Sequence, residues 1–304
     1  MRKLRWLLLP AALLWLTGYE AQSLDRCLAE TTVECALDGA VDAARQIKLQ
    51  YERAVAYAYI ARVEAGAGMP DAARQHLGEV KLLKREVPGP ALRDGISANQ
   101  ARVRAMLGEF SEALDLAEGI RDPVAAVRAW AWIAENQAKA GDNAGADRSL
   151  ERALAAATEL GPAQMAFPMA MMAIVRVRQG ALADGLAAAK AARAIASDYD
   201  EVLWQVRVAS LVAVAEAAAG KKEQAHETIQ QAVQNMHGMV DGGASTKEHM
   251  SALAYVAWAK ALSGDEEGAH AELDQLKTLI DDFPDHFWRS ISLSAIALVL
   301  AKAE

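Results

Sequence analysis

The sequence predicts an all-α fold built from stacked helical hairpins, and two observations point to it. Hydrophobic residues make up 53% of the 304-residue chain and alanine dominates them, while aromatic residues reach only 6%. This composition favours helix over strand, because alanine has the highest helix propensity and strands prefer aromatic and β-branched residues. The second observation is a spacing of small residues around a glycine that recurs six times, which is typical of a repeat architecture.

The first 23 residues have the three-part layout of a secretory signal peptide. Residues 1–5 are positively charged, residues 6–16 are apolar and residues 17–23 are small and polar. The apolar run is short for a membrane-spanning helix. We therefore expect cleavage after Ser23 and a periplasmic or secreted mature protein, with an uncleaved signal anchor as the alternative.

Cys27 and Cys35 are the only cysteines, and both follow the predicted cleavage site. An exported chain meets an oxidising compartment, so we expect a disulfide between them, in an N-terminal capping segment 24–50, that stabilises the fold by about 2.5 kcal/mol. A redox pair and a metal site are the alternatives, but redox pairs have closer spacing and no histidine lies nearby. Within this capping segment, residues 35–47 resemble a lone second helix of a hairpin.

Six glycines mark the turns of the repeats, at spacings of 33 to 44 residues: Gly68, Gly108, Gly141, Gly180, Gly220 and Gly264. An alanine stands seven residues before each of them, at Ala61, Ala101, Ala134, Ala173, Ala213 and Ala257. A small residue stands five residues after each, at Ala73, Ala113, Ala146, Gly185, Ala225 and Ala269. Two antiparallel helices approach closely only where side chains are small, so these positions predict the helix crossings.

The turn chemistry agrees with this interpretation. Glycine provides the positive φ that ends the first helix of each hairpin, and Ser111, Asp142 or Asp265 is placed to cap the second. Asp122 followed by Pro123 predicts the start of another first helix. After Asp285, residues 286–304 are expected to form a last helix that covers the exposed end of the core.

These motifs resemble the tetratricopeptide repeat family over residues 51–304, with the small residue, the turn glycine and the later alanine in the family's register. The family's tyrosine, four residues before the glycine, is replaced by Glu64, Arg104, Gln137, Arg176, Glu216 and Lys260. The leading tryptophan remains only as Trp130, and the closing proline is missing. The resemblance implies a right-handed α-solenoid of about six helix-turn-helix repeats plus a C-terminal capping helix.

In proteins of this family the first helices line a concave binding face. The candidate groove residues, taken from positions six and thirteen before the glycines, are Arg62, Arg102, Arg128, Glu135, Phe167, Arg207 and Trp258. Arginine and apolar side chains in one groove suit a peptide that carries acidic and apolar groups. The alternative is that these arginines are solvated or paired with neighbouring glutamates.

The formal net charge of −8 argues against nucleic acid as a partner, because an acidic chain lacks the field that binds phosphates. No nucleophile elbow and no phosphate-binding glycine loop occurs, so we expect no enzyme and no cofactor. The sequence therefore predicts a non-catalytic scaffold or adaptor in the cell envelope that binds a protein or peptide partner.

Two other functions stay open. Met165, Met169, Met171 and Met172 cluster beside Phe167, and exported methionine clusters can bind copper(I). Helical spacing puts Met169 and Met172 on one apolar face, which favours ordinary packing instead. The other alternative is a membrane assembly factor held by an uncleaved signal anchor.

Overall fold

The computed structural model describes residues 32–302, and this part of the chain contains fourteen α-helices and no strand. Seven helices form an inner layer: α3 (Gln50–Gly66), α5 (Pro90–Met106), α7 (Pro123–Lys139), α9 (Ala166–Arg178), α11 (Val202–Ala218), α13 (Thr246–Ser263) and α15 (His286–Leu300). Seven form an outer layer: α2 (Val33–Gln46), α4 (Pro70–Glu86), α6 (Phe110–Glu118), α8 (Asn143–Thr158), α10 (Leu182–Ser197), α12 (Lys222–Asp241) and α14 (Glu266–Asp282). A short 3-10 helix, η2 (Pro162–Met165), leads into α9.

The predicted all-α repeat solenoid is confirmed. Six consecutive hairpins, from α3 with α4 to α13 with α14, each pair one inner helix with one outer helix. All six turn glycines have a positive φ, between 76° and 90°. The signal segment 1–23 and Cys27 lie outside the described residues, so signal cleavage and the disulfide stay predictions. Cys35 lies in the first turn of α2, where its N–H bonds to the Thr32 side chain.

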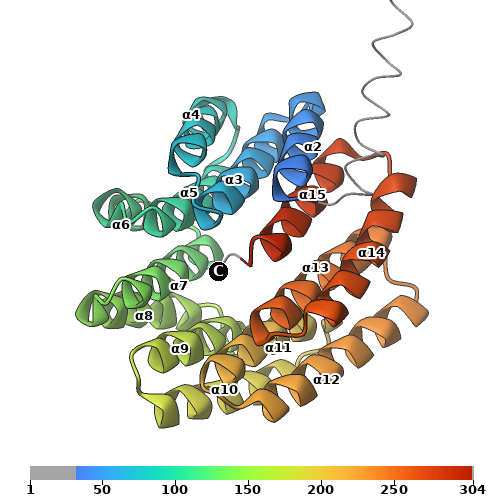
Figure 1. The fold of residues 1–304 in the computed structure, drawn as a ribbon. Helices are drawn as coiled ribbons and strands as arrows, with labels where there is room; N and C mark the ends of the chain where they lie inside the picture. The colour runs from blue at the N-terminus through green and yellow to red at the C-terminus, as the bar shows by residue number, and fades with distance from the viewer. Residues whose placement is uncertain (1–31, 303–304) are drawn as a thin grey trace, which may run out of the picture.

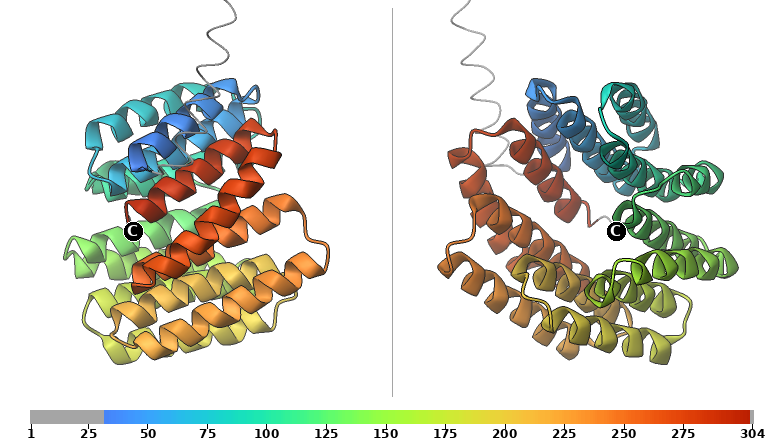
Figure 2. Two further views of the ribbon diagram at one scale, coloured as in Figure 1. Left: turned by 45° about the vertical axis from the view of Figure 1, so that its right-hand side comes forward. Right: turned by 180° about the vertical axis from the view of Figure 1, so that it is seen from behind.

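The solenoid closes into a ring. Each inner helix contacts the next one, and the last of them, α15, contacts the first, α3 (Figures 1 and 2). Helices α15 and α2 pack together as the two members of a hairpin do, although they come from opposite ends of the chain. The Ser290 hydroxyl donates a hydrogen bond of 2.8 Å to the carbonyl oxygen of Ala40 in this contact. The capping helix therefore covers the core by completing a seventh helix pair with α2.

Small residues hold the two layers together at the predicted crossings. The alanines seven before the turn glycines are all fully buried, and so are the small residues five after, apart from Ala269 at 2% exposure and the buried Gly185. At Gly185 the helices approach closely, since an added Cβ would lie 2.7 Å from a methyl carbon of Val177 and 3.0 Å from the Ala173 carbonyl oxygen. Backbone cannot move aside cheaply, so this unit requires glycine where the others have alanine.

We expect Gly185→Ala to destabilise the protein by about 1–3 kcal/mol, as overpacked cores do. Gly78→Ala is the matched control, because Gly78 lies in the exposed face of α4 with no atom near an added Cβ. That control should stabilise the protein by up to about 1 kcal/mol, through the better helix propensity of alanine. Urea unfolding of both variants measures the difference, and equal midpoints would contradict the close approach.

Polar bridges occupy the position four residues before each turn glycine. In four units the residue four before the glycine contacts the residue twelve positions later on the outer helix: Glu64 with His76 at 2.8 Å, Gln137 with Ser149 at 2.7 Å, Glu216 with Thr228 at 2.7 Å and Lys260 with Glu272 at 2.7 Å. In the other two units Arg104 bonds to Glu109, and Arg176 bonds to Asp147 of the preceding unit. The first four bridges satisfy polar groups that the crossing buries, whereas Arg104 and Arg176 are only half-buried.

Most of the predicted caps form. Asp142 accepts from Gly145 N–H, Asp265 from Gly268 N–H and Asp122 from Ala125 N–H, each at 2.8 or 2.9 Å. The expectation for Ser111 was wrong, because α6 begins at Phe110 and its N-cap position is Glu109, two residues before Ser111 and without a side-chain cap. Asp285 caps α15 with bonds to two backbone N–H groups.

Candidate functional site

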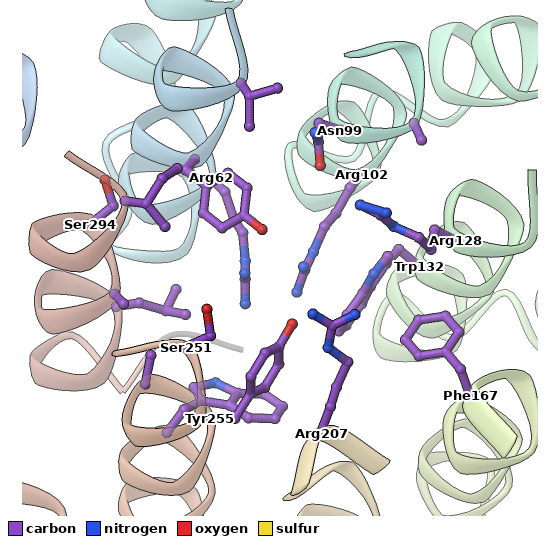
Figure 3. Close-up of a pocket in the computed structure, with 18 of the residues that line it drawn as sticks. Arg62, Asn99, Arg102, Arg128, Trp132, Phe167, Arg207, Ser251, Tyr255 and Ser294 are labelled. Carbon is purple, nitrogen blue, oxygen red and sulfur yellow. The ribbon is translucent and has the colours of Figure 1, made fainter. Parts of the chain in front are cut away.

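The ring encloses a pocket of about 290 Å³ at its centre (Figure 3). All seven inner helices contribute side chains to it, so its shape depends on ring closure. Helix α15 supplies six of the lining residues: Phe287, Trp288, Ile291, Ser294, Ala295 and Leu298. The volume lies near the lower end of the range of small-molecule pockets, which begins at about 300 Å³.

The pocket concentrates positive charge. Four arginines line it, Arg62, Arg102, Arg128 and Arg207, and none of its lining residues is an aspartate or a glutamate. This is the reverse of the whole chain, whose formal charge is −8. Arg62, Arg102 and Arg207 reach into the pocket from two sides and their guanidinium groups converge near the Tyr255 hydroxyl (Figure 3). Arg128, in contrast, is exposed to solvent.

Arg102 has the most constrained guanidinium group. Its central carbon lies 3.3 Å from the centroid of the Trp132 ring, which is a close cation–π contact. Its Nε and Nη2 atoms are buried without a hydrogen-bond acceptor. Burial, together with the positive charge of Arg62, lowers the pKa of Arg102 well below its usual value. The folded chain therefore holds this charge in a place that disfavours it.

Arg62 and Arg207 also have unused donors. The Nε atoms of both are buried with no acceptor. Burial lowers the pKa of Arg62, whereas the neighbouring Tyr255 raises the pKa of Arg207. The Arg207 guanidinium lies 4.9 Å from the centroid of the Tyr255 ring. Counting those of Arg102, four buried guanidinium nitrogen atoms in the pocket lack a partner in the protein, and so does the indole Nε1 of Trp204.

Tyr255 responds to this charge. Burial raises the pKa of its phenol, but the positive charges of Arg207, Arg62, Arg128 and Arg102 outweigh burial, so the pKa is lowered below its usual value. Opposite charges nearby favour the phenolate, which fixes the sign of this shift. The pocket therefore stabilises a negative charge at the Tyr255 oxygen.

We expect Arg207→Gln to raise the pKa of Tyr255 towards the ordinary tyrosine value of about 10. The near-ultraviolet absorbance of tyrosinate, followed against pH, measures it when the titration of a Tyr255→Phe variant is subtracted. Arg148→Gln is the control, because Arg148 is exposed on the outer helix α8. An unchanged titration in Arg207→Gln would contradict the contact.

Aromatic rings form much of the pocket wall: Tyr59, Trp132, Phe167, Trp204, Tyr255, Trp258, Phe287 and Trp288. Phe167 links two of them, with ring centroids 6.2 Å from Trp132 and 6.2 Å from Trp204. Such a wall presents large, rigid apolar surfaces to a ligand. The arginines provide charge and the rings provide a place for an apolar body.

The structure brings six of the seven predicted groove residues to this pocket: Arg62, Arg102, Arg128, Phe167, Arg207 and Trp258. Glu135 does not line it. Its side chain is buried, at 3% exposure for the residue, and one carboxylate oxygen lies 3.1 Å from Arg178. The field of Glu135 still raises the pKa of Arg62 and of Arg102 in part.

One set of pocket residues, at a shared repeat position, was not among the groove residues predicted from the sequence. The position nine before the turn glycine lines the pocket in five of six units, as Tyr59, Asn99, Trp132, Leu211 and Tyr255. It lies one helical turn from the position thirteen before, so both face the same way. Combining these two registers would have found Trp132 and Tyr255, but nothing in the repeat spacing points to Phe287 and Trp288 of α15.

The alternative sites have ordinary surroundings. Met171 is fully buried in the core, and Met165, Met169 and Met172 pack against it or its neighbours. Within residues 32–302 no group of three or more histidine, cysteine, aspartate or glutamate side chains is arranged to hold a metal ion. None of the helices in the same range has both the length and the apolar character to cross a membrane.

Comparison with known proteins adds no family to this description. The chain matches no family model, and no curated protein matches it significantly.

Proposed function

We propose that this protein is a non-catalytic binding protein that holds a negatively charged ligand group in the centre of its helical ring. The observation that carries the proposal is the set of buried, unpaired guanidinium N–H groups of Arg62, Arg102 and Arg207 in a pocket without carboxylates. An anion would accept hydrogen bonds from these donors and neutralise their charge.

Arginines elsewhere in the chain support this interpretation. Arg152 pairs with Glu118 at 2.5 Å and Arg74 pairs with Glu109 at 2.7 Å. These two arginines, which connect neighbouring repeats, each have a carboxylate partner. Burying a charge without a partner costs free energy. Arg62 and Arg102, whose charges burial disfavours, therefore weaken the unliganded protein, and a bound anion would remove that cost.

The resemblance to tetratricopeptide repeats supports a binding role on the inner face. Closure of the ring changes the shape of the binding site that this face offers. An open solenoid offers a long groove to an extended peptide, whereas this pocket is surrounded by seven inner helices. We propose that it admits a compact ligand or the end of a partner chain. The predicted signal segment supports a location in the cell envelope.

A matched pair of fluorescent probes tests the proposal. 8-Anilinonaphthalene-1-sulfonate carries an anionic group on an aromatic body, and N-phenyl-1-naphthylamine has nearly the same body without the charge. We expect saturable binding of the sulfonate by the folded protein and much weaker binding of the neutral amine. Arg102→Gln and Arg62→Gln should each reduce the affinity for the sulfonate at least about tenfold, the loss of one charge-assisted hydrogen bond.

The control for this experiment is Arg148→Gln, which removes an arginine from the outer layer and should leave binding unchanged. Equal affinities of the wild type and both pocket variants for the sulfonate would contradict the proposal. So would equal binding of the two probes, because the aromatic wall alone would then account for the affinity.

A further inference from the structure

We infer that the ligand of the central pocket is a compact organic dianion, such as a phosphate monoester or a dicarboxylate, attached to an aromatic or branched apolar body. This inference rests on the proposed function and names its ligand class. It follows from three features of the pocket: the number of unpaired donors, the balance of charge and the position of the aromatic rings.

The donors are too many and too widely placed for one acceptor atom. Arg62 and Arg102 approach from α3 and α5, and Arg207 approaches from α11 on the other side (Figure 3). Four buried nitrogen atoms of these guanidinium groups have no acceptor in the protein. A phosphate monoester presents three terminal oxygens in a tetrahedral arrangement, which lets one group accept from both sides at once.

The charge balance calls for more than one negative charge. The carboxylate whose field reaches Arg62 and Arg102 is that of Glu135, which is bound to Arg178 at 3.1 Å. No carboxylate lines the pocket itself. Three converging guanidinium groups carry three positive charges, so a dianion offsets two of them where a monoanion offsets only one. The lowered pKa of Tyr255 agrees with this positive potential.

The apolar body has a defined place. Trp132 lies beneath the Arg102 guanidinium, and its ring continues through Phe167 to Trp204. A ligand whose anionic group meets Arg102 would therefore place an attached ring along this wall. The cavity of about 290 Å³ has room for a body of one or two rings.

Isothermal titration calorimetry with four probes tests the inference on the purified full chain. The probes are 1-naphthyl phosphate, 1-naphthalenesulfonate, inorganic phosphate and 1-naphthol, used at a pH at least about one unit above the second phosphate pKa of about 6. We expect naphthyl phosphate to bind at least about ten times more tightly than naphthalenesulfonate, because its second charge strengthens the hydrogen bonds from the guanidinium groups. Naphthol and inorganic phosphate should both bind more weakly than naphthyl phosphate.

The outcomes separate this inference from the proposed function. Equal affinities for the phosphate and the sulfonate would overturn the dianion while leaving an anion-binding pocket. Inorganic phosphate binding as tightly as naphthyl phosphate would overturn the apolar body. Failure of every anion to bind would overturn both proposals.

Variants of Arg207 assign the preference to the pocket. Arg207→Gln should remove the preference for naphthyl phosphate over naphthalenesulfonate, and Arg207→Lys should retain part of it because the charge stays. Circular dichroism and the melting temperature show that each variant is folded, and Arg148→Gln should behave as the wild type. A preference that survives in Arg207→Gln would overturn the assignment.

The same chemistry could come from a free small molecule or from the end of a partner chain. A short peptide with Asp-Phe at a free C-terminus carries two carboxylates beside a ring and represents the second source. Tighter binding of naphthyl phosphate than of this peptide assigns a free organic dianion, and tighter binding of the peptide assigns a chain end. Binding of neither would overturn the inference.

Discussion

Replacing Ser290 by leucine is expected to loosen the closure of the ring. Ser290 is fully buried, and its hydroxyl donates to the carbonyl oxygen of Ala40 in α2. A leucine cannot make this bond and adds volume where α15 and α2 are in contact, so we expect a loss of about 2–4 kcal/mol, from overpacking and from the lost hydrogen bond. Amide hydrogen exchange should then accelerate in α2, which lies about 250 residues away in sequence.

The control for ring closure is a core truncation far from the contact. Leu150→Ala in α8 removes a buried side chain, at 2% exposure, and should cost about 2–5 kcal/mol. Its effect on exchange should be strongest in its own hairpin and its neighbours, with α2 protected. If Ser290→Leu leaves α2 as protected as Leu150→Ala does, the two ends of the chain are not joined in solution.

Lys260→Met and Arg102→Gln are expected to change stability in opposite directions. Lys260 pairs with Glu272 at 2.7 Å, and both residues are buried. Removing the lysine leaves a buried carboxylate with a single long bond, of 3.5 Å, from Gln275. We expect a loss of about 3–5 kcal/mol, as for other buried ion pairs that are broken on one side.

Arg102→Gln should instead stabilise the unliganded protein, by about 1 kcal/mol. The variant removes a charge that burial and the neighbouring charge of Arg62 both disfavour. We expect the free-energy cost of the unpaired donors to exceed the stabilisation from the cation–π contact with Trp132. A gain of that size corresponds to a rise of about 2–4 °C in the melting temperature. The same variant should lose anion binding.

Differential scanning calorimetry without ligand measures both effects. Arg148→Gln serves as a control for the change of charge, since it should change the free energy of unfolding by less than about 0.5 kcal/mol. A destabilised Arg102→Gln protein would mean that Arg102 supports the fold of the ring, and the argument for an unpaired, ligand-binding arginine would fail.

Local spacing in the sequence is enough to predict the helical hairpins. The glycine at each turn, the alanine seven before and the small residue five after depend only on how two adjacent helices cross, so the sequence alone predicts them. The same holds for the caps at Asp122, Asp142 and Asp265. Ser111 shows the limit of this reasoning, because the N-cap position is Glu109, two residues earlier than expected, and Ser111 lies inside the helix.

The candidate site was predicted in part, for a related reason. Arg62, Arg102 and Arg207 occupy repeat registers that face the inner side. Helix geometry therefore predicts that all three side chains lie on the same face of the solenoid. Glu135 occupies the same register as Arg62 and Arg102, but Arg178 of the next inner helix bonds to it and keeps it out of the pocket lining. Such a pairing between units depends on how neighbouring repeats are placed, which no single register shows.

The helices, their hairpins and most of the arginines on the inner face can be predicted from the sequence, because these features follow from contacts within about 40 residues. The sequence also marks residues 35–47 as a lone second helix and residues 286–304 as a last helix that covers the end of the core. That these two helices form one pair follows from the tertiary structure alone. The small rotation between successive repeats adds up over six hairpins and brings α15 onto α2. That closure turns an expected groove into a pocket.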